Sequence, residues 1–321
     1  MKRRITKPPH RIELAPLCNG PEEVHVFDDE SIWALNAALA ARRPLLVRGE
    51  PGVGKTQLAR AAAAKEILHC PIIWFVVDYS TEARDLLWTF DAVKRLAEAQ
   101  MSGALRETTS EIQARLDPKR FFHPGPLWWA FNWTDAQEQA DLVGDASPPT
   151  PSGWKPGDGC VVLIDEIDKA ESDVPNGLLE ALGAGVFHPK GRRERVEIMG
   201  IPPLVVITSN EERVLPDAFV RRCLVLDMAL PKSAEALTTL LIERGRAHFG
   251  DLTNDDVLAI GAEMLVKDRL GAHSTPVPGQ AEYLDLIRVV AELCPGDYDK
   301  QKQTLERVAS FVLKKHLSAV E

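Results

Sequence analysis

Five short apolar runs recur along the first 230 residues, and none of them alternates apolar with polar positions. They are 44–49 (PLLVRG), 71–77 (PIIWFVV), 160–165 (CVVLID), 203–209 (PLVVITS) and 223–228 (CLVLDM). A strand that is apolar at every position has both faces buried, as in a parallel sheet that is covered by helices. Helical periodicity separates the runs, at 31–42, 55–68, 83–101 and 172–184. The pattern predicts an α/β fold with three layers.

The strand pattern stops after about residue 231. Four helical patterns follow, at 233–248, 255–270, 280–293 and 298–319. We therefore expect an N-terminal tail over 1–21, an α/β core over 22–230 and a small all-helical lid domain over 231–321. Within the core, the stretch 144–159 is rich in proline, glycine and serine, which predicts a loop.

Composition limits the function classes. The chain of 321 residues has 45% apolar and 26% charged residues, as soluble globular proteins do, and its net charge of -9 argues against a nucleic-acid partner. The five cysteines form no C-x-x-C pair, so neither a zinc site nor a disulfide framework is indicated. No segment approaches the roughly 20 apolar residues that span a bilayer, and no signal peptide opens the chain. We expect a cytoplasmic protein with no membrane contact.

The stretch GEPGVGKT at 49–56 matches the phosphate-binding pattern G-x-x-x-x-G-K-[ST]. It follows a predicted buried strand and precedes a helix, which is the context that such a loop requires. Lys55 is expected to reach the β- and γ-phosphates of ATP, and Thr56 to place its hydroxyl on Mg²⁺. The expected nucleotide-binding residues are Gly49, Glu50, Pro51, Gly52, Val53, Gly54, Lys55, Thr56 and Gln57.

Two carboxylates follow the apolar strand of the segment VVLIDEID. Asp165 is expected to bind Mg²⁺, and Glu166 to orient and deprotonate the attacking water. Paired carboxylates after a strand can also cap the next helix, and Asp168 is the better candidate for that role.

The strand LVVITSN ends in Asn210. Ligands of open α/β sheets bind at the carboxyl ends of the strands, where this amide is expected to help fix the lytic water near the γ-phosphate.

These segments, from about Val26 to Met228, resemble the AAA+ ATPases, and among them the MoxR-like group. RPLLVRGEPGVGKTQLA is similar to the phosphate-loop region of that group, TEARDLLWTF to its acidic-Leu-Leu segment, and FFHPGPLWWAF to the Gly-Pro segment before the metal-binding strand. LPDAFVRRCLV resembles its Leu-Pro-x-Ala-x-x-x-Arg segment. This last match places the arginine finger at Arg222, which would act in trans on the nucleotide of the next subunit. Arg221 would pair with Glu211, Glu212 or the neighbouring subunit.

The resemblance implies a ring, expected to be a hexamer, that hydrolyses ATP with Mg²⁺ at its subunit boundaries. The energy would remodel or activate a partner protein, often one with a von Willebrand factor A domain. Two alternatives remain: an NTP-driven motor of a nucleic-acid restriction complex, similar to the McrB-like GTPases, and a nucleotide-gated scaffold with little turnover. The acidic balance argues against the first, and the set Lys55, Asp165, Glu166 and Asn210 argues against the second.

The sequence departs from the MoxR-like pattern at three places. Insertions are expected at about 91–120, which reads as helical, and at about 132–159. Relatives carry an arginine near the start of the third lid helix, where this chain has Val277 and Gly279. Arg269 and Arg288 are the available substitutes.

The segment GVFHPKGRRERVEI at 185–198 predicts a hairpin with Lys190, Arg192, Arg193 and Arg195 at its tip. In related rings a loop in this region faces the central pore. A solvated basic tip that keeps the hairpin from aggregating is an equally good interpretation.

Overall fold

The computed structural model describes residues 4–6, 8–16, 23–105, 108–271 and 277–313. The chain forms two compact units. The first comprises Met1–Pro8, Asp29–Arg48 and Ala59–Leu226, and the second comprises Pro9–Asp28, Gly49–Leu58 and Asp227–Glu321. Each unit has a hydrophobic core of its own.

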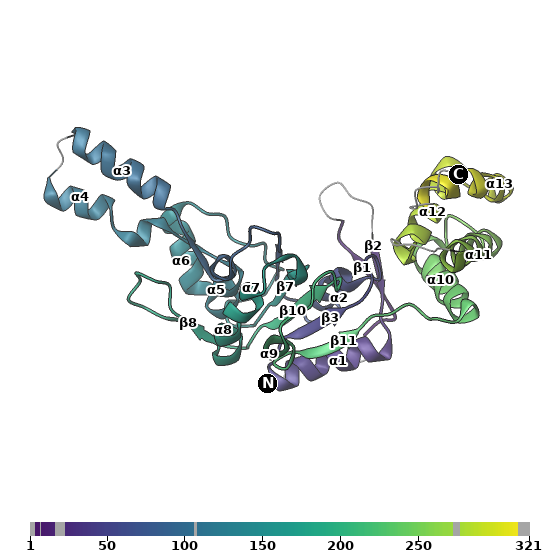
Figure 1. The fold of residues 1–321 in the computed structure, drawn as a ribbon, viewed down its shortest axis with the longest axis horizontal. Helices are drawn as coiled ribbons and strands as arrows, with labels where there is room; N and C mark the ends of the chain where they lie inside the picture. The colour runs from purple at the N-terminus through teal and green to yellow at the C-terminus, as the bar shows by residue number, and fades with distance from the viewer. Residues whose placement is uncertain (1–3, 7, 17–22, 106–107, 272–276, 314–321) are drawn as a thin grey trace. The chain divides into compact units, whose positions relative to one another are not determined.

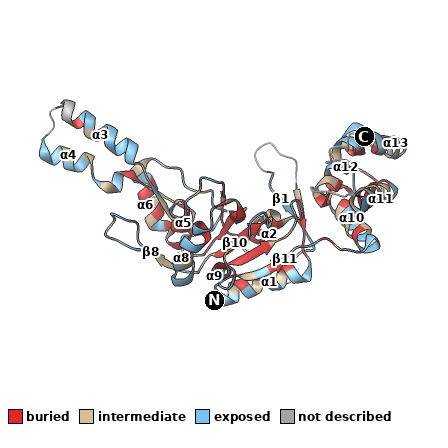
Figure 2. Ribbon diagram, viewed as in Figure 1, coloured by how far each residue is buried: buried red, intermediate tan, exposed pale blue. Residues whose placement is uncertain are grey.

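A five-stranded sheet forms the centre of the first unit (Figure 1). Its order is β11 (Leu224–Asp227), β3 (Leu45–Arg48), β10 (Leu204–Ser209), β7 (Val161–Asp165) and β4 (Ile72–Val76). β10 runs parallel to both β3 and β7, and β4 runs parallel to β7. Every residue of β7 and β10 is buried, as the continuous red of the central strands shows in Figure 2. The α/β prediction is confirmed.

Short helices accompany the sheet: α1 (Asp29–Ala41), α2 (Lys55–Ala63), α7 (Asp173–Gly177), α8 (Leu179–Ala184) and α9 (Asp217–Val220). Helix α2 ends five residues before the predicted end at 68, because the carbonyls of Ala62 and Ala63 accept from the backbone N–H groups of Leu68 and Cys70 instead of continuing the helix. The predicted helix 172–184 is divided into α7 and α8 at Leu178.

The prediction of one helix over 83–101 is wrong. The segment contains a short 3₁₀ helix, η1 (Ala83–Leu86), a strand, β5 (Trp88–Phe90), and the start of α3 (Ala92–Leu105). Strand β5 pairs antiparallel with β6 (Phe122–Pro124), and α3, α4 (Thr109–Arg115) and η2 (Pro118–Phe121) lie between the two strands. The new helix begins after β5 because the carboxylate of Asp91 accepts from the backbone N–H of Lys94, at 2.7 Å.

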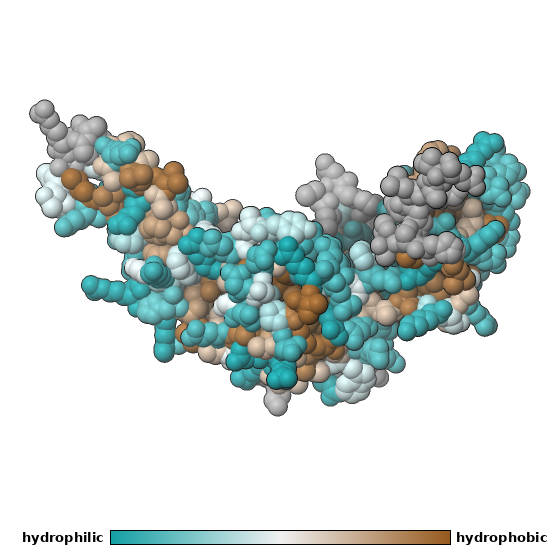
Figure 3. Space-filling model, viewed as in Figure 1, coloured by the Kyte–Doolittle hydropathy of each residue, from teal (hydrophilic) through white to brown (hydrophobic). Residues whose placement is uncertain are grey.

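The helical pair α3 and α4 extends away from the sheet within the first unit (Figure 1). Apolar side chains along α3 are exposed, among them Val93, Leu96 and Met101, and brown atoms mark this region in Figure 3. The insertion expected at 91–120 is therefore helical, and it stands on a two-stranded base.

Aromatic side chains fill the core beside the sheet. Helix α5 (Pro126–Phe131) carries Trp128, which is completely buried, and α6 (Trp133–Val143) begins with Trp133, which is also buried. The rings of Trp133 and Trp154 meet edge to face, with their centroids 4.6 Å apart. Trp154 belongs to the stretch 144–159, which forms a loop as predicted. Trp128 and Trp133 serve as core anchors.

The second unit contains the predicted helical bundle. Its helices are α10 (Ala234–Phe249), α11 (Asp255–Gly271), α12 (Gln280–Leu293) and α13 (Tyr298–Val312), and the predicted extension to 319 lies outside the described residues. An antiparallel pair, β1 (Arg11–Leu14) and β2 (Glu23–Val26), was not indicated by the sequence pattern. Arg244 of α10 donates to the carbonyl of Val26 at 2.6 Å, which attaches β2 to the bundle. In the described part of the chain, no helix has the length and apolar character to cross a membrane.

Candidate nucleotide site

The loop between β3 and α2 is built around two glycines in left-handed or related conformations. Gly49 has φ +146°, and a Cβ there would lie 2.1 Å from the carbonyl oxygen of Met228. Gly52 has φ +78°, and its Cβ would lie 2.6 Å from the Cβ of Ala281 at the start of α12. No other residue fits either position, so the loop can wrap tightly in the way that phosphate binding requires.

Lys55 opens α2 and is almost completely buried. Its ammonium group donates to the carbonyl oxygens of Gly49 and Glu50, at 2.7 and 2.8 Å. The lysine is thus folded back over the loop that precedes it, and the first turn of α2, with Thr56, follows directly. A helix N-terminus preceded by a glycine-rich loop is an anion-binding arrangement.

Asp165 ends β7 and is 7% exposed. One carboxylate oxygen accepts from the hydroxyl of Thr208 at 2.5 Å, and the other accepts from the indole N–H of Trp74 at 3.2 Å. Trp74 and Thr208 lie on β4 and β10, the two strands that flank β7. The neighbouring strands therefore fix the orientation of the carboxylate. Sequence reasoning did not find either partner, and the polar Thr208 near the end of an apolar strand was the available signal.

Glu166 has φ +59°, which is unusual for a residue with a side chain. Its backbone N–H donates to the Thr208 hydroxyl at 2.9 Å, and its carboxylate accepts from the amide of Asn210 at 3.2 Å. The other carboxylate oxygen pairs with Lys169, and this hydrogen bond raises the lysine's pKa. Backbone strain of this kind is concentrated at functional sites. The structure thus brings together two predicted residues, Glu166 and Asn210.

Asp168 does not cap a helix, in contrast to the interpretation offered from the sequence. Its carboxylate is buried and accepts from the backbone N–H groups of Asn210, at 3.1 Å, and Glu212, at 2.9 Å. It therefore holds the segment after β10, and so the backbone of Asn210, against the segment after β7.

The donor set around Asp165 fits Mg²⁺ in a nucleotide complex. Within the described ranges, no three His, Cys, Asp or Glu side chains are grouped so that they could hold a metal ion. Mg²⁺ in nucleotide sites takes one or two protein oxygens and completes its shell with phosphate oxygens and water. The carboxylate of Asp165 is one such protein oxygen, so no cluster of acids is required.

Arg221 and Arg222 follow α9 and are exposed. Neither side chain pairs with Glu211 or Glu212 in the described structure; Glu211 lies instead 3.8 Å from Arg48. The guanidinium of Arg43 holds the backbone of this turn in place, because it donates to the carbonyls of Arg221, Arg222 and Cys223. The predicted finger is thus on a well-anchored turn, and its side chain is available to a partner.

The two candidate lid arginines differ in their surroundings. Arg269 on α11 donates from one nitrogen to both carboxylate oxygens of Glu50, at 2.7 and 2.8 Å, and from another to the carbonyl of Pro278. Arg288 on α12 pairs with Asp285 of the same helix and lies over the ring of Phe249. Of these two arginines, Arg269 is the one that contacts the phosphate loop, through Glu50.

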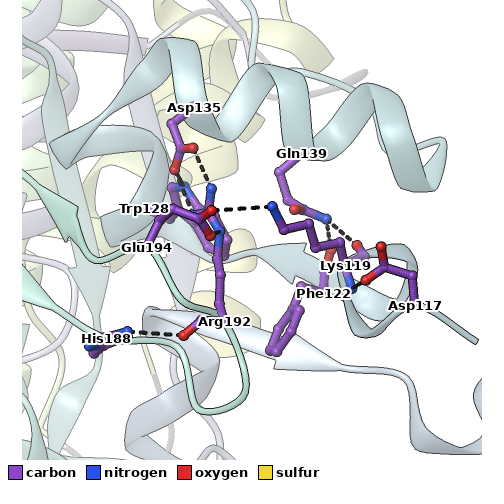
Figure 4. A network of polar contacts seen from close by, with 9 residues as sticks. All are labelled: Asp117, Lys119, Phe122, Trp128, Asp135, Gln139, His188, Arg192 and Glu194. Carbon is purple, nitrogen blue, oxygen red and sulfur yellow. Dashed lines mark hydrogen bonds and ion pairs between the residues drawn. The ribbon is translucent and has the colours of Figure 1, made fainter.

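The hairpin of β8 (Val186–Phe187) and β9 (Val196–Glu197) forms as predicted, but its basic tip needs a correction. The side chain of Arg192 is only 8% exposed: it pairs with Asp135 of α6 and lies over the ring of Trp128, 4.7 Å from the centroid (Figure 4). The pair raises the pKa of Arg192, and although burial opposes ionisation of Asp135, Arg192 lowers that carboxyl's pKa. Arg192 anchors the loop, while Lys190 and Arg193 remain exposed.

Residues 44–223 match the family described as AAA domain (dynein-related subfamily). The chain belongs to this AAA family. The matched span begins just before β3 and ends just before β11, so it contains the phosphate loop, the Asp165 strand, Asn210 and Arg222. ATP binding and hydrolysis are the general activity of AAA domains. The comparison with curated proteins found no match.

Proposed function

We propose that this AAA protein is a MoxR-like ATPase that hydrolyses ATP at the subunit boundaries of a ring, expected to be a hexamer, and remodels or activates a partner protein. One observation carries the proposal of turnover: the carboxylate of Glu166 and the amide of Asn210 lie 3.2 Å apart at the ends of adjacent strands. The carboxylate contacts this neutral amide through one oxygen and Lys169 through the other. Both contacts hold it at the strand end, where it would position and deprotonate water. A scaffold that only binds nucleotide has no need of this pair.

The phosphate loop begins at the residue after β3, and Ser209 of β10 is in register with Arg48, the last residue of β3. Lys55 would exchange its loop carbonyls for phosphate oxygens, and the nine residues from Gly49 to Gln57 would hold the nucleotide. Thr56 and Asp165 would hold Mg²⁺, which neutralises phosphate charge when bound. Glu166 would take a proton from the attacking water, and Asn210 would orient that water through its amide.

The partner is proposed to be a protein, as in MoxR-like relatives, where it often has a von Willebrand factor A domain. Exposed apolar side chains on α3 support a protein contact, because a solvated helix of a monomer normally presents polar residues there. The net charge of -9 favours a protein over nucleic acid, and therefore the MoxR-like assignment over a McrB-like one.

Two variants test the proposal. Lys55→Ala should abolish ATP binding, since the phosphates lose a charge-assisted contact. Glu166→Gln should bind ATP and assemble, but hydrolyse it at least 100-fold more slowly, a loss of about 3 kcal/mol in transition-state stabilisation. Nucleotide binding, assembly and phosphate release should be measured on both. Equal loss of binding in the two variants would contradict these separate roles.

Trapping should identify the partner. Glu166→Gln loaded with ATP is expected to retain the partner in a pull-down, and Lys55→Ala serves as the matched control because it cannot load. A partner that is retained equally by both variants does not depend on the nucleotide state.

A further inference from the structure

A cavity of about 440 Å³ lies at the amino ends of β3 and β11. The turn between α1 and β3, the helix α8, and the turn between α9 and β11 form its walls. Four arginines line it, Arg42, Arg43, Arg221 and Arg222, and the lining includes no carboxylate. The volume is in the range of small-molecule sites.

One of the four arginines has a structural task. Arg43 donates to the carbonyl oxygens of Arg222, at 2.9 Å, and Cys223, at 3.1 Å, and also to that of Arg221. The backbone N–H of Leu224 in turn donates to the carbonyl of Pro44 at 2.8 Å. The two turns are therefore bound to each other, and the positions from which Arg221 and Arg222 extend are fixed relative to Arg42.

Arg42 has an uncommon backbone conformation. Its φ is +55°, in the left-handed region, at the position after α1 where glycine is the usual residue. A side chain there costs free energy, so an arginine in place of glycine needs a compensating role. The C-terminus of a helix attracts a cation, but an arginine one residue later, such as Arg43, would meet that need without strain.

The remaining three guanidinium groups have no counter-ion in the part of the chain that the structure describes. Among the described residues, Arg42, Arg221 and Arg222 have no side-chain ion pair. A neighbouring cavity shares Arg42 and Arg43, but there Arg195 is paired with Glu197 at 2.9 Å. Unpaired like charges around one cavity repel each other, and a multivalent anion relieves that repulsion. Guanidinium groups match phosphate oxygens in geometry and charge.

We propose that Arg42 is a further residue of the site that the proposed function assigns to Arg222, and that its guanidinium contacts the phosphates of a nucleotide held by a second copy of the chain. The arginines lie at the amino end of β3, whereas the chain's own phosphate loop follows the carboxyl end of that strand. A second copy is thus the natural source of the phosphates. The inference rests on the proposed function and adds Arg42 to it.

Arg42→Gly is the decisive variant, because glycine suits φ +55° and the fold should gain or retain thermal stability. ATP hydrolysis per subunit should fall at least tenfold, as expected for loss of a charged hydrogen bond. Binding of fluorescent ATP by the variant's own loop should be unchanged. Arg42→Lys, which keeps the charge, should recover part of the rate. Arg307→Ala, at an exposed position on α13, removes the same charge and should hydrolyse like the wild type.

Mixing tests whether the role is in trans. Lys55→Ala subunits have an intact Arg42 but no working loop, so adding them to Arg42→Gly subunits should restore hydrolysis. A loss that mixing does not restore, although mixed assemblies form, overturns the proposal, as does wild-type activity in Arg42→Gly. Absence of nucleotide binding in the wild type would instead refute the proposed function.

Inorganic tripolyphosphate distinguishes the two sources of phosphate. If the Lys55→Ala chain binds it under conditions where the chain is monomeric, and the double variant Lys55→Ala with Arg42→Gly does not, the cavity takes free oligophosphate. If mixing also fails to restore hydrolysis, the phosphate site stands and the second-copy source is refuted. No binding by the monomer, together with restoration in the mixture, assigns the phosphates to the second copy.

Discussion

The guanidinium group of Arg269 forms an ion pair with Glu50, one nitrogen lying 2.7 and 2.8 Å from the two carboxylate oxygens. Glu50 is a residue of the phosphate loop, and Arg269 is on a helix of the bundle. A carboxylate in a phosphate loop repels phosphate unless a cation neutralises it. We therefore infer that Arg269 neutralises the charge of Glu50 and so allows the loop to bind an anion.

Arg269→Ala should weaken ATP binding about fivefold, the effect of about 1 kcal/mol of like-charge repulsion near a protein surface. Removing the repelling charge should cancel the defect, so that Arg269→Ala with Glu50→Gln binds nearly as the wild type does. Arg288→Ala is the control, since that arginine pairs on its own helix. Titration with fluorescent ATP gives the affinities of the wild type, Arg269→Ala, Glu50→Gln, the double variant and the control. An additive double variant would contradict the coupling.

Arg222→Ala should bind ATP normally and hydrolyse it at a small fraction of the wild-type rate, because a trans-acting arginine contributes about 10³–10⁵ in rate in GTPases. Mixed with Lys55→Ala subunits, it should regain activity, since some boundaries then combine a sound loop with a sound finger. Arg221→Ala should cost less. The measurement is steady-state phosphate release over a range of mixing ratios, with subunit exchange checked separately. A larger defect in Arg221→Ala would assign the finger to that residue instead.

Arg192→Ala should destabilise the first unit by about 3 kcal/mol, because it leaves Asp135 and the ring of Trp128 without their partner. The loss corresponds to a fall of about 5–10 °C in Tm. Arg193→Ala, one residue away and exposed, should change stability by less than about 0.5 kcal/mol. Thermal unfolding followed by tryptophan fluorescence suits the comparison, since all seven tryptophans lie in the first unit. Equal Tm values in the two variants would show that the contact is unimportant.

The exposed pair Lys190 and Arg193 provides the remaining test of the hairpin. If these residues contact an acidic partner in the pore, Lys190→Glu with Arg193→Glu should abolish stimulation of hydrolysis by the partner. Basal hydrolysis should persist. Stimulation that stays at the wild-type level would identify the hairpin as ordinary surface.

The free energy of unfolding should decrease as the pH is lowered below about 6.5. Burial and the charge of Arg244 lower the pKa of His25 to about 3, and burial with Arg288 and Arg244 lowers that of His248 to about 4. Both histidines are neutral in the folded and unfolded states above pH 6.5. Below it the unfolded chain binds more protons, so His25 alone costs about 2 kcal/mol at pH 5. The loss should continue down to the folded-state pKa values.

His25→Phe should reduce this acid sensitivity. Helix content measured by circular dichroism should show a smaller fall in Tm between pH 8 and pH 5 for this variant than for the wild type. His10→Phe, at an exposed position, is the control and should behave as the wild type does. The same pH dependence in all three proteins would exclude His25 as the cause.

Local sequence was sufficient to predict the features that depend on a few consecutive residues. The five strands of the sheet, the four helices of the bundle and the loop at 49–56 each follow from an apolar run, a helical period or a glycine pattern. Burial of every strand on both faces does not hold, because the edge strands β4 and β11 are partly exposed. The helix predicted over 83–101 fails because the pairing of Trp88–Phe90 with residues 122–124 depends on a segment about thirty residues away. Strands β1 and β2 were missed because each has only four residues, too few for an apolar pattern to stand out.

Contacts at the site required the fold. Thr208 and Trp74 hold Asp165 only because β4 and β10 flank β7, and strand order is not encoded in any single run. The basic segment around Arg192 predicts a solvated tip. The burial of Arg192 depends instead on Asp135 and Trp128, which lie more than 50 residues away in the sequence.

The base of the α3–α4 insertion has an architectural consequence. The chain enters the helical pair through β5 and leaves it through β6, and these two strands are paired. The backbone N–H of Asp91 also donates to the carbonyl of Phe121 at 2.9 Å. The chain therefore enters and leaves the α3–α4 pair through a closed two-stranded neck, and Lys119 beside this neck also contacts Gln139 and Glu194. Helices of other length or sequence can be exchanged above such a neck without disturbing the register of the sheet, so one ATPase core can acquire a different recognition module by a single local replacement.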